Sequence, residues 1–120
     1  MFYTKDNLFM RLVFTLLTIY GLLSVNSINQ TMAAEIDITA GEQIFSANCS
    51  ACHSGGNNVI MPEKTLQKSI LEKNEMYTVD AITNQVKNGK NAMPAFGGRL
   101  TDDDITNVAN YVIEKSESGW

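Results

Sequence analysis

The stretch Cys49-Ser50-Ala51-Cys52-His53 decides the fold of this chain. Its C-x-x-C-H spacing is the attachment signature of c-type haem. Two cysteines at this spacing can both reach the haem vinyl groups and form thioether bonds. The next residue is then held beside the macrocycle, so the imidazole of His53 can bind the iron as the proximal ligand. The pentapeptide therefore predicts one covalently attached haem c.

Two other uses of the motif remain open from the pentapeptide alone. A disulfide or a thioredoxin-type redox pair would use the same cysteines, and an oxidising compartment would favour it. A thioredoxin motif belongs in a strand-helix-strand context, however, and this one lies between a predicted helix and a predicted loop. A structural zinc site usually has four protein ligands, whereas residues 34–120 offer two Cys and one His. We therefore favour haem.

A sixth ligand would separate an electron carrier from a haem protein with an open site. Methionine is the natural candidate, because its thioether favours ferrous iron and raises the reduction potential. Met61, Met76 and Met93 follow the motif. Met61 stands only eight residues after His53, whereas Met93 stands forty residues after it with two predicted helices between. The spacing favours Met93, although any single Met can instead be a core residue that fills a gap.

The apolar residues around the motif have helical spacing in four segments. In the first, Thr39 and Glu42 have the form of a capping box, which predicts a helix to about Cys49 with Ile44 and Phe45 inward. A second helix is predicted around residues 66–71. The apolar positions of the second, third and fourth helices are Leu66, Ile70 and Leu71; Val79, Ile82 and Val86; and Ile105, Val108, Ala109 and Val112.

The ends of the last two helices are also marked in the sequence. The third helix should stop near Gly89, because glycine tolerates the left-handed conformation that closes a helix. Thr101 is the predicted cap of the fourth, whose acidic first turn suits the positive end of the helix dipole. Loops are expected over residues 54–63 and 89–100. No segment alternates with period two, so we expect no strands.

Residues 1–33 have the order of a secretory signal peptide. Lys5 and Arg11 form a basic region, residues 12–25 carry no charge, and Thr31 and Ala33 stand at the two recognition positions of a cleavage site. The fourteen uncharged residues fall short of the roughly 20 that a helix needs to cross a bilayer. We therefore expect residues 1–33 to be removed, leaving residues 34–120 as one domain without stable membrane insertion.

The domain of residues 34–120 is small and acidic. It has seven Lys or Arg and twelve Asp or Glu, a formal charge of −5. Binding to nucleic acid or to anionic lipid needs clustered positive charge, so neither is expected. A domain of this size buries only about 60% of its unfolded surface and often depends on a disulfide, a metal or a cofactor.

The stretches on both sides of the motif resemble the cytochrome c6 branch of the class I c-type cytochromes. The resemblance covers nearly all of residues 34–120. It implies an all-α, class I cytochrome c fold of about four helices around one covalently bound haem c, with His53 and Met93 as axial ligands. The stretches that carry it are Phe45-Ser46-Ala47-Asn48-Cys49 with Cys52-His53, Gly55-Gly56-Asn57-Asn58-Val59-Ile60, Lys64-Thr65-Leu66, Asn88-Gly89-Lys90-Asn91-Ala92-Met93-Pro94-Ala95-Phe96 and Gly119-Trp120.

The resemblance also implies a function, a soluble one-electron carrier of photosynthesis that is not an enzyme. Such a carrier is a monomer in the thylakoid lumen of a plastid or a cyanobacterium, where it takes electrons from the cytochrome b6f complex and passes them to photosystem I. Two alternatives remain open. One is a donor to a respiratory terminal oxidase, and the other is a haem enzyme or sensor with an open sixth site.

Further residues are expected near the haem. The carbonyl of Pro62 could accept a hydrogen bond from Nδ1 of His53 and so orient the ring. Gln85 faces the haem in proteins that resemble this one and is linked there to setting the potential. In similar cytochromes the arginine after Phe-Gly-Gly, here Arg99, contacts the photosystem; a haem propionate or a surface group is the alternative partner. Phe96 is expected in an apolar rim of the docking patch, with Ala92, Pro94 and Ala95.

Gly41 predicts a close crossing of the first and last helices. A missing side chain lets two helix backbones approach, so Gly41 and Phe45, four residues apart, should meet Tyr111. The resemblance supports this expectation, since a similar crossing forms the core of the class I cytochrome fold.

Overall fold

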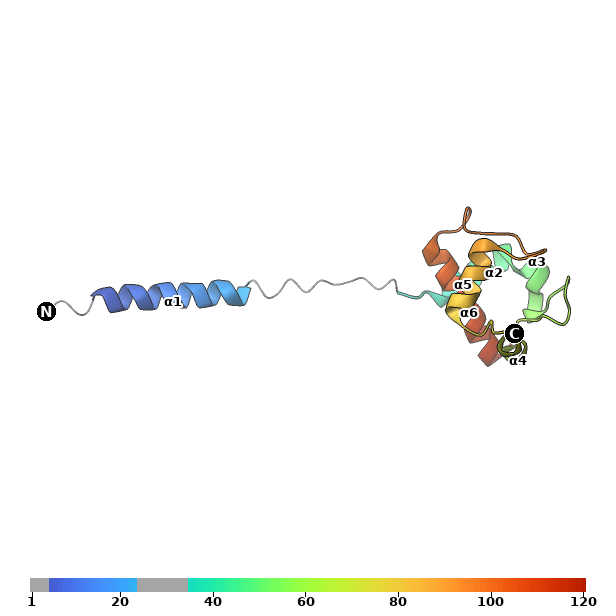
Figure 1. Ribbon diagram of the computed structural model, residues 1–120, viewed down its shortest axis with the longest axis horizontal. Coiled ribbons are helices and arrows are strands. Elements are labelled where there is room, and N and C mark those ends of the chain that lie inside the picture. Colours follow the sequence, from blue (N-terminus) through green and yellow to red (C-terminus); the bar gives the residue numbers. More distant parts are fainter. Residues whose placement is uncertain (1–4, 24–34) are drawn as a thin grey trace. The chain divides into compact units, whose positions relative to one another are not determined.

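The structure, a computed structural model, describes residues 5–23 and 35–120 (Figure 1). The chain divides into two parts, Met1–Ala33 and Ala34–Trp120, which are described separately. In the first part, residues Lys5–Leu23 form the helix α1. Within the described ranges, no helix combines the length and the apolar character needed to span a bilayer. The predicted cleavage site at Thr31 and Ala33 lies outside the described residues, so removal of residues 1–33 stays a prediction.

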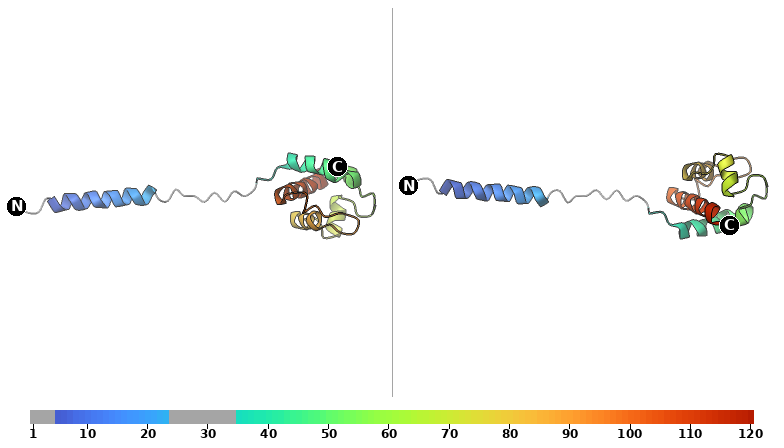
Figure 2. Two further views of the ribbon diagram at one scale, coloured as in Figure 1. Left: turned by 90° about the horizontal axis from the view of Figure 1, so that it is seen from above. Right: turned by 90° about the horizontal axis from the view of Figure 1, so that it is seen from below.

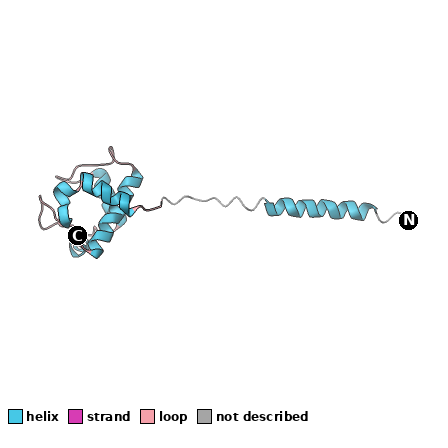
Figure 3. Ribbon diagram, turned by 180° about the vertical axis from the view of Figure 1, so that it is seen from behind, coloured by secondary structure: helices cyan, strands magenta, loops and turns pink. Residues whose placement is uncertain are grey.

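The second part is built from helices, and its described residues, 35–120, contain no strand (Figure 3). The predicted all-α fold class is confirmed, and the four predicted segments correspond to α2, α4, α5 and α6. Two short elements of the motif region, α3 and η2, were not predicted. The bounds are α2 Ile38–Asn48, α3 Ser50–His53, the 3-10 helix η2 Ser54–Gly56, α4 Lys68–Lys73, α5 Val79–Asn88 and α6 Asp102–Ser118.

Helix α6 lies at the centre of the domain, and α2 lies along one side of it (Figure 2). They cross at Gly41, where a Cβ would lie 2.8 Å from the carbonyl carbon of Asn107 and 2.9 Å from the Cβ of Tyr111. One turn later, the rings of Phe45 and Tyr111 pack with centroids 5.4 Å apart. The predicted contact of Gly41 and Phe45 with Tyr111 is confirmed.

The apolar face predicted for the last helix is buried in full. Its four residues are at most 6% exposed and pack with apolar residues of α2, α4 and α5 in one core. This face explains why the other helices gather around α6. The four residues are Ile105, Val108, Ala109 and Val112.

The start of α2 corrects one prediction. Asp37, and not Thr39, is the N-cap: its carboxylate accepts a hydrogen bond from the amide of Ala40 at 2.9 Å. The amide of Asp37 itself donates to the side-chain oxygen of Asn107 at 3.0 Å. The Thr39–Glu42 capping box is therefore wrong, because a better cap two residues earlier is also fixed to α6.

The ends of α5 and α6 agree with the sequence. Thr101 caps α6 in a capping box, in which its hydroxyl accepts from the amide of Asp104 at 3.1 Å and its amide donates to the Asp104 carboxylate at 3.0 Å. Helix α5 begins after the cap Thr78 and ends at Asn88, before the C-cap Gly89, which has φ +69°. Local sequence thus sets both ends of α5 and the start of α6.

The crossing at Gly41 makes a stability prediction. A Gly41→Ala substitution should lower the free energy of unfolding, because overpacking costs about 1–3 kcal/mol and better helix propensity offsets only about 0.5–1 kcal/mol. Gly98→Ala is the matched control, since a Cβ there would meet nothing within 4 Å. Urea denaturation of the haem-loaded protein measures both. Equal stabilities would show that the crossing is looser than the structure indicates.

Candidate functional site

A cavity of about 290 Å³ lies among the helices of residues 35–120, at the lower end of the roughly 300–1,000 Å³ typical of ligand cavities. Its lining is mostly apolar. The cavity is also lined by all four of the predicted haem residues, Cys49, Cys52, His53 and Met93, and by Gln85. Apolar side chains from α2, α4, α5, α6 and the loops complete it, among them Phe45, Leu66, Leu71, Ile82, Val86 and Val112.

One helical turn brings the three motif residues to the cavity. Cys49 is the C-cap of α2, and its carbonyl accepts from the amides of Cys52 at 3.1 Å and His53 at 2.9 Å. Residues three and four apart lie on the same face of a helix. The turn α3 therefore presents both sulfur atoms and the imidazole to the same space, directly after the helix that is anchored at Gly41.

Cys49 and Cys52 are not joined in a disulfide. The pKa of the Cys49 thiol is raised to about 11. The main cause is burial of the thiol, and the neighbouring Cys52 raises the pKa further. Reactive redox cysteines have lowered pKa values instead, because the thiolate is the nucleophile. The surroundings of Cys49 therefore disfavour the thioredoxin-type alternative.

The imidazole of His53 is held by the loop that follows it. Its Nδ1 lies 3.0 Å from the carbonyl oxygen of Asn57. With the proton on Nδ1, the ring donates to Asn57 and leaves Nε2 free to bind a metal. Gly55 and Gly56, with φ +61° and +71°, turn the chain back so that Asn57 reaches the ring.

This hydrogen bond corrects the prediction for Pro62. Pro62 is exposed, and His53 uses Asn57 as its acceptor. The prediction failed because Asn57 is only four residues from His53 and the two glycines between them allow a tight return. The Gly-Gly-Asn stretch was the signal in the sequence that could have identified the acceptor.

A tight turn fixes Met93. The backbone of Lys90 and Met93 exchanges two hydrogen bonds of 3.0 Å each, and Asn91 between them has φ +53°. The side-chain amide of Gln85 lies 3.6 Å from the Met93 sulfur. Gln85 thus lines the cavity beside the predicted ligand. Met61 and Met76 line the same cavity, so Met93 as the sixth ligand stays a prediction.

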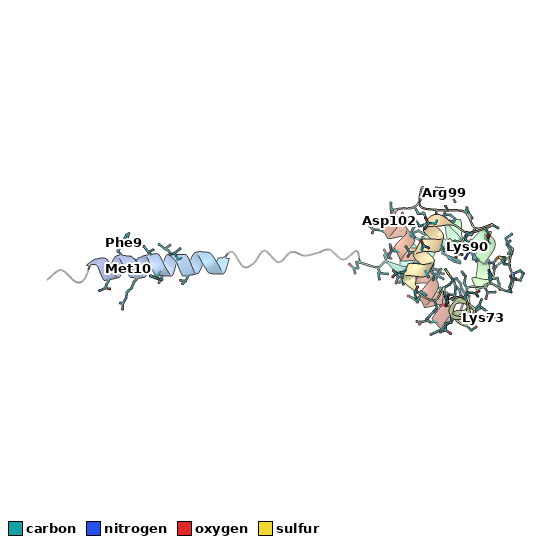
Figure 4. The ribbon with its side chains drawn as sticks, in the orientation of Figure 1. Phe9, Met10, Lys73, Lys90, Arg99 and Asp102 are labelled. Atoms are coloured by element: carbon teal, nitrogen blue, oxygen red, sulfur yellow. The ribbon has the colours of Figure 1, made fainter. Side chains whose placement is uncertain are left out.

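Of the two residues predicted in the docking patch, Arg99 is exposed and Phe96 is buried. Phe96 is only 5% exposed and belongs to the core, so its assignment to an exposed rim is wrong. Its amide donates to the carbonyl of Val86, which draws the loop onto α5. Arg99 is exposed, its guanidinium lies 4.6 Å from the centroid of the Phe96 ring, and it lies at the outer edge of the domain in Figure 4.

Asn58 is a second residue that sequence reasoning missed. Its side-chain oxygen accepts from the amides of Ile60 at 3.1 Å and Met61 at 2.9 Å, and its side-chain nitrogen donates to the carbonyl of Lys64 at 3.0 Å. One side chain thereby shapes the loop that lines this part of the cavity. Asn at the start of a turn commonly bonds to backbone groups further on, which was the available signal.

The residues of the cavity fit a haem c. Two thiols and an imidazole on one turn match the attachment motif, and a thioether enters from another loop. The wall between them is mostly apolar, which suits a flat macrocycle. Lys64 and Lys90 also line the cavity, so positive charge is available to acidic groups of a ligand.

Comparisons with known proteins agree with this chemistry. Residues 36–112 match the family model described as cytochrome c oxidase, cbb3-type, subunit III. Cytochrome c6 of Gracilaria tenuistipitata var. liui is 63% identical over 111 residues, which cover 92% of this chain and 100% of that protein. Cytochrome c6 of Bumilleriopsis filiformis is 71% identical over 84 residues, which cover 70% and 98%.

The similarity extends to solved structures. The structure of cytochrome c6 from the diatom Phaeodactylum tricornutum superposes with a TM-score of 0.68 at 60% identity, covering 70% of this chain and 99% of that one. The structure of cytochrome c6C from Synechococcus sp. PCC 7002 gives 0.65 at 40% identity, covering 68% and 99%. The chain therefore belongs to the cytochrome c6 family of class I c-type cytochromes, and its cofactor is one covalently bound haem c.

Proposed function

We propose that the protein is a soluble one-electron carrier of photosynthesis, which takes electrons from the cytochrome b6f complex and passes them to photosystem I in the thylakoid lumen. The observation that carries the proposal is the cavity itself. It is lined by two thiols, an imidazole and a thioether within an apolar wall, in a chain 63% identical over 111 residues to a cytochrome c6.

Each of the four residues has a distinct role in this proposal. Cys49 and Cys52 hold the haem through thioether bonds, and the bound haem supplies the redox chemistry. Nε2 of His53 and the sulfur of Met93 would bind its iron. If both residues bind the iron, no coordination site would remain for a substrate or a gas, as expected of a carrier and not of an enzyme or a sensor.

The surface around the cavity suits brief docking. Exposed apolar residues stand at its edge, with Ile60 61% exposed and Ala92 and Pro94 also exposed. A carrier must release its partner quickly, so its contact should be small, below about 1,200 Å² in total. These residues replace Phe96 in the proposed apolar rim, and charge on neighbouring residues would steer the approach.

Export to the lumen is part of the proposal. Residues 1–33 carry the predicted signal peptide, and its removal would leave residues 34–120 as a monomeric carrier. The alignment with the Gracilaria protein spans 92% of the chain and therefore extends beyond the haem domain into this segment. A similar leading segment in that cytochrome c6 supports a shared destination.

Electron donation to a respiratory oxidase is a second candidate function. The family model that matches residues 36–112 takes its description from a subunit of a cbb3-type oxidase. That match is confined to the haem domain, whereas the cytochrome c6 of Gracilaria aligns over 92% of the chain. We therefore favour the photosynthetic role.

The proposed ligation predicts the behaviour of two methionine variants. Met93→Ala should abolish the weak near-infrared charge-transfer band of the oxidised protein and lower its potential, because the iron loses its thioether. Met61→Leu should keep the band, since this half-buried residue lines the same cavity without ligating. If the band instead disappears in Met61→Leu and survives in Met93→Ala, Met61 is the ligand.

The proposed docking predicts the effect of charge at Arg99. Arg99→Glu should slow the reduction of photosystem I in flash kinetics by about tenfold at low salt, because surface charge acts on the association rate. The difference should shrink as salt rises, since the Debye length is only about 8 Å at physiological ionic strength. Lys73→Glu is the matched control, as Lys73 is an exposed cation in the last turn of α4 (Figure 4).

Stability must be measured in the same variants. Arg99 packs on the Phe96 ring, and such a contact is worth about 0.5–1 kcal/mol at exposed sites. Urea denaturation therefore separates weaker docking from a disturbed loop. Equal rates for Arg99→Glu and the wild type at low salt would mean that Arg99 does not steer the approach.

A further inference from the structure

Trp120 connects the core of the domain to the loop that follows the haem motif. It comes after Gly119, the C-cap of α6, which has φ +103° and turns the chain out of the helix direction. The indole packs against Phe45 of α2 with ring centroids 5.1 Å apart, and edge-on against Tyr111 of α6 at 6.2 Å. Two helices therefore fix the position of the ring.

The indole also lies at the neck of the loop formed by residues 57–65, that is, where Gly56 and Leu66 meet at its two ends. The amide of Leu66 donates to the carbonyl of Gly56 at 2.7 Å, which joins the two ends of this loop. The indole Nε1–H donates to the carbonyl of Leu66 at 3.1 Å. A Cβ built on Gly56 would lie only 2.5 Å from Nε1 of Trp120. The ring thus covers one end of the loop and is hydrogen-bonded to the other.

The covered end of the loop leads directly to the partner of His53. Gly56 is followed by Asn57, whose carbonyl lies 3.0 Å from Nδ1 of His53. The other hydrogen bonds of Asn57 are local: its amide and its side-chain nitrogen both donate to the carbonyl of Ser54, at 3.2 Å and 3.1 Å. A shift of Gly56 would therefore move the acceptor that orients the imidazole.

We propose that Trp120 is a positioning residue for His53. By holding Gly56 and Leu66 together, it keeps the Asn57 carbonyl against the imidazole and so fixes the ring and its tautomer. The inference rests on the proposed role of His53 as an axial ligand. Within residues 35–120, no hydrogen bond or ring contact joins Trp120 to His53 or to another proposed ligand, so its effect passes through the loop.

The competing explanation is that Trp120 only adds apolar contact to the core. The two explanations differ in where the protein opens. A core residue changes global unfolding, whereas a clamp at the loop neck changes a local opening that precedes it. Exchange of the His53 Nδ1 proton with solvent reports the local opening, because that proton is released only when its bond to Asn57 breaks.

The test is nitrogen-15 NMR of the reduced, haem-loaded protein with three variants. Trp120→Leu removes both the ring and the donor, Trp120→Phe keeps a ring over Gly56 without the donor, and Ile105→Val creates a defect in α6 at a residue that is 0% exposed and does not line the cavity. Proton exchange is measured at His53 Nδ1 and at the Leu66 amide. Urea denaturation of each variant gives the correction for global stability.

If Trp120 holds the loop neck closed, the rates of proton exchange should differ in a graded way among the variants. After the correction, exchange at both protons should be at least about tenfold faster in Trp120→Leu than in the wild type, intermediate in Trp120→Phe, and unchanged in Ile105→Val, because only the first two open the loop neck. Exchange that follows global stability alike in all three variants would overturn the inference.

A failure of the underlying ligation would look different. If His53 is not a ligand, its ring protons in the oxidised wild type will lack the large paramagnetic shifts caused by a bound iron. That result would remove the proposed ligation and this inference with it. If the His53 ring protons do show large paramagnetic shifts, but the stability-corrected exchange rates in Trp120→Leu equal those of the wild type, only this inference is removed and the ligation stands.

Discussion

The close crossing of α2 and α6 at Gly41 is the constraint on which the rest of the domain depends. Because no side chain separates the backbones there, Phe45 reaches Tyr111 and the end of α2 is fixed relative to α6. The haem motif begins at that end, so the crossing determines where its sulfur atoms and imidazole stand. Helix α5 packs on α6, and Phe96 of the loop that carries Met93 belongs to the same core. The helices on both sides of the cavity are thereby held against α6.

The sequence predicted those features that depend on local pattern. The ends of α5 and α6 follow from Gly89 and Thr101, and the crossing follows from Gly41. Predictions from the sequence failed where a contact between residues far apart in the chain decides the local structure. Asp37 caps α2 partly because it is also bonded to Asn107, seventy residues away, and Phe96 is buried because its loop bonds to α5. The spacing of residues along the sequence does not predict such contacts.

The candidate site was predictable in its chemistry and less so in its supports. The pentapeptide identifies two thiols and an imidazole, and all three line one cavity with Met93 and Gln85. The groups that hold them were missed or misassigned, because backbone carbonyls such as that of Asn57 carry no signature in a sequence. The haem motif also does not distinguish between the two candidate electron acceptors, photosystem I and a respiratory oxidase. The cavity suits either, and the choice between them depends on exposed residues around it.

The central claim is that this cavity holds one haem c fixed by Cys49 and Cys52. The most direct measurement is mass spectrometry of the protein expressed with haem-attachment machinery, before and after extraction with acidic acetone. The account predicts the mass of the chain plus one haem in both samples, since thioether bonds survive the extraction. An unmodified mass with a disulfide between Cys49 and Cys52 would contradict it.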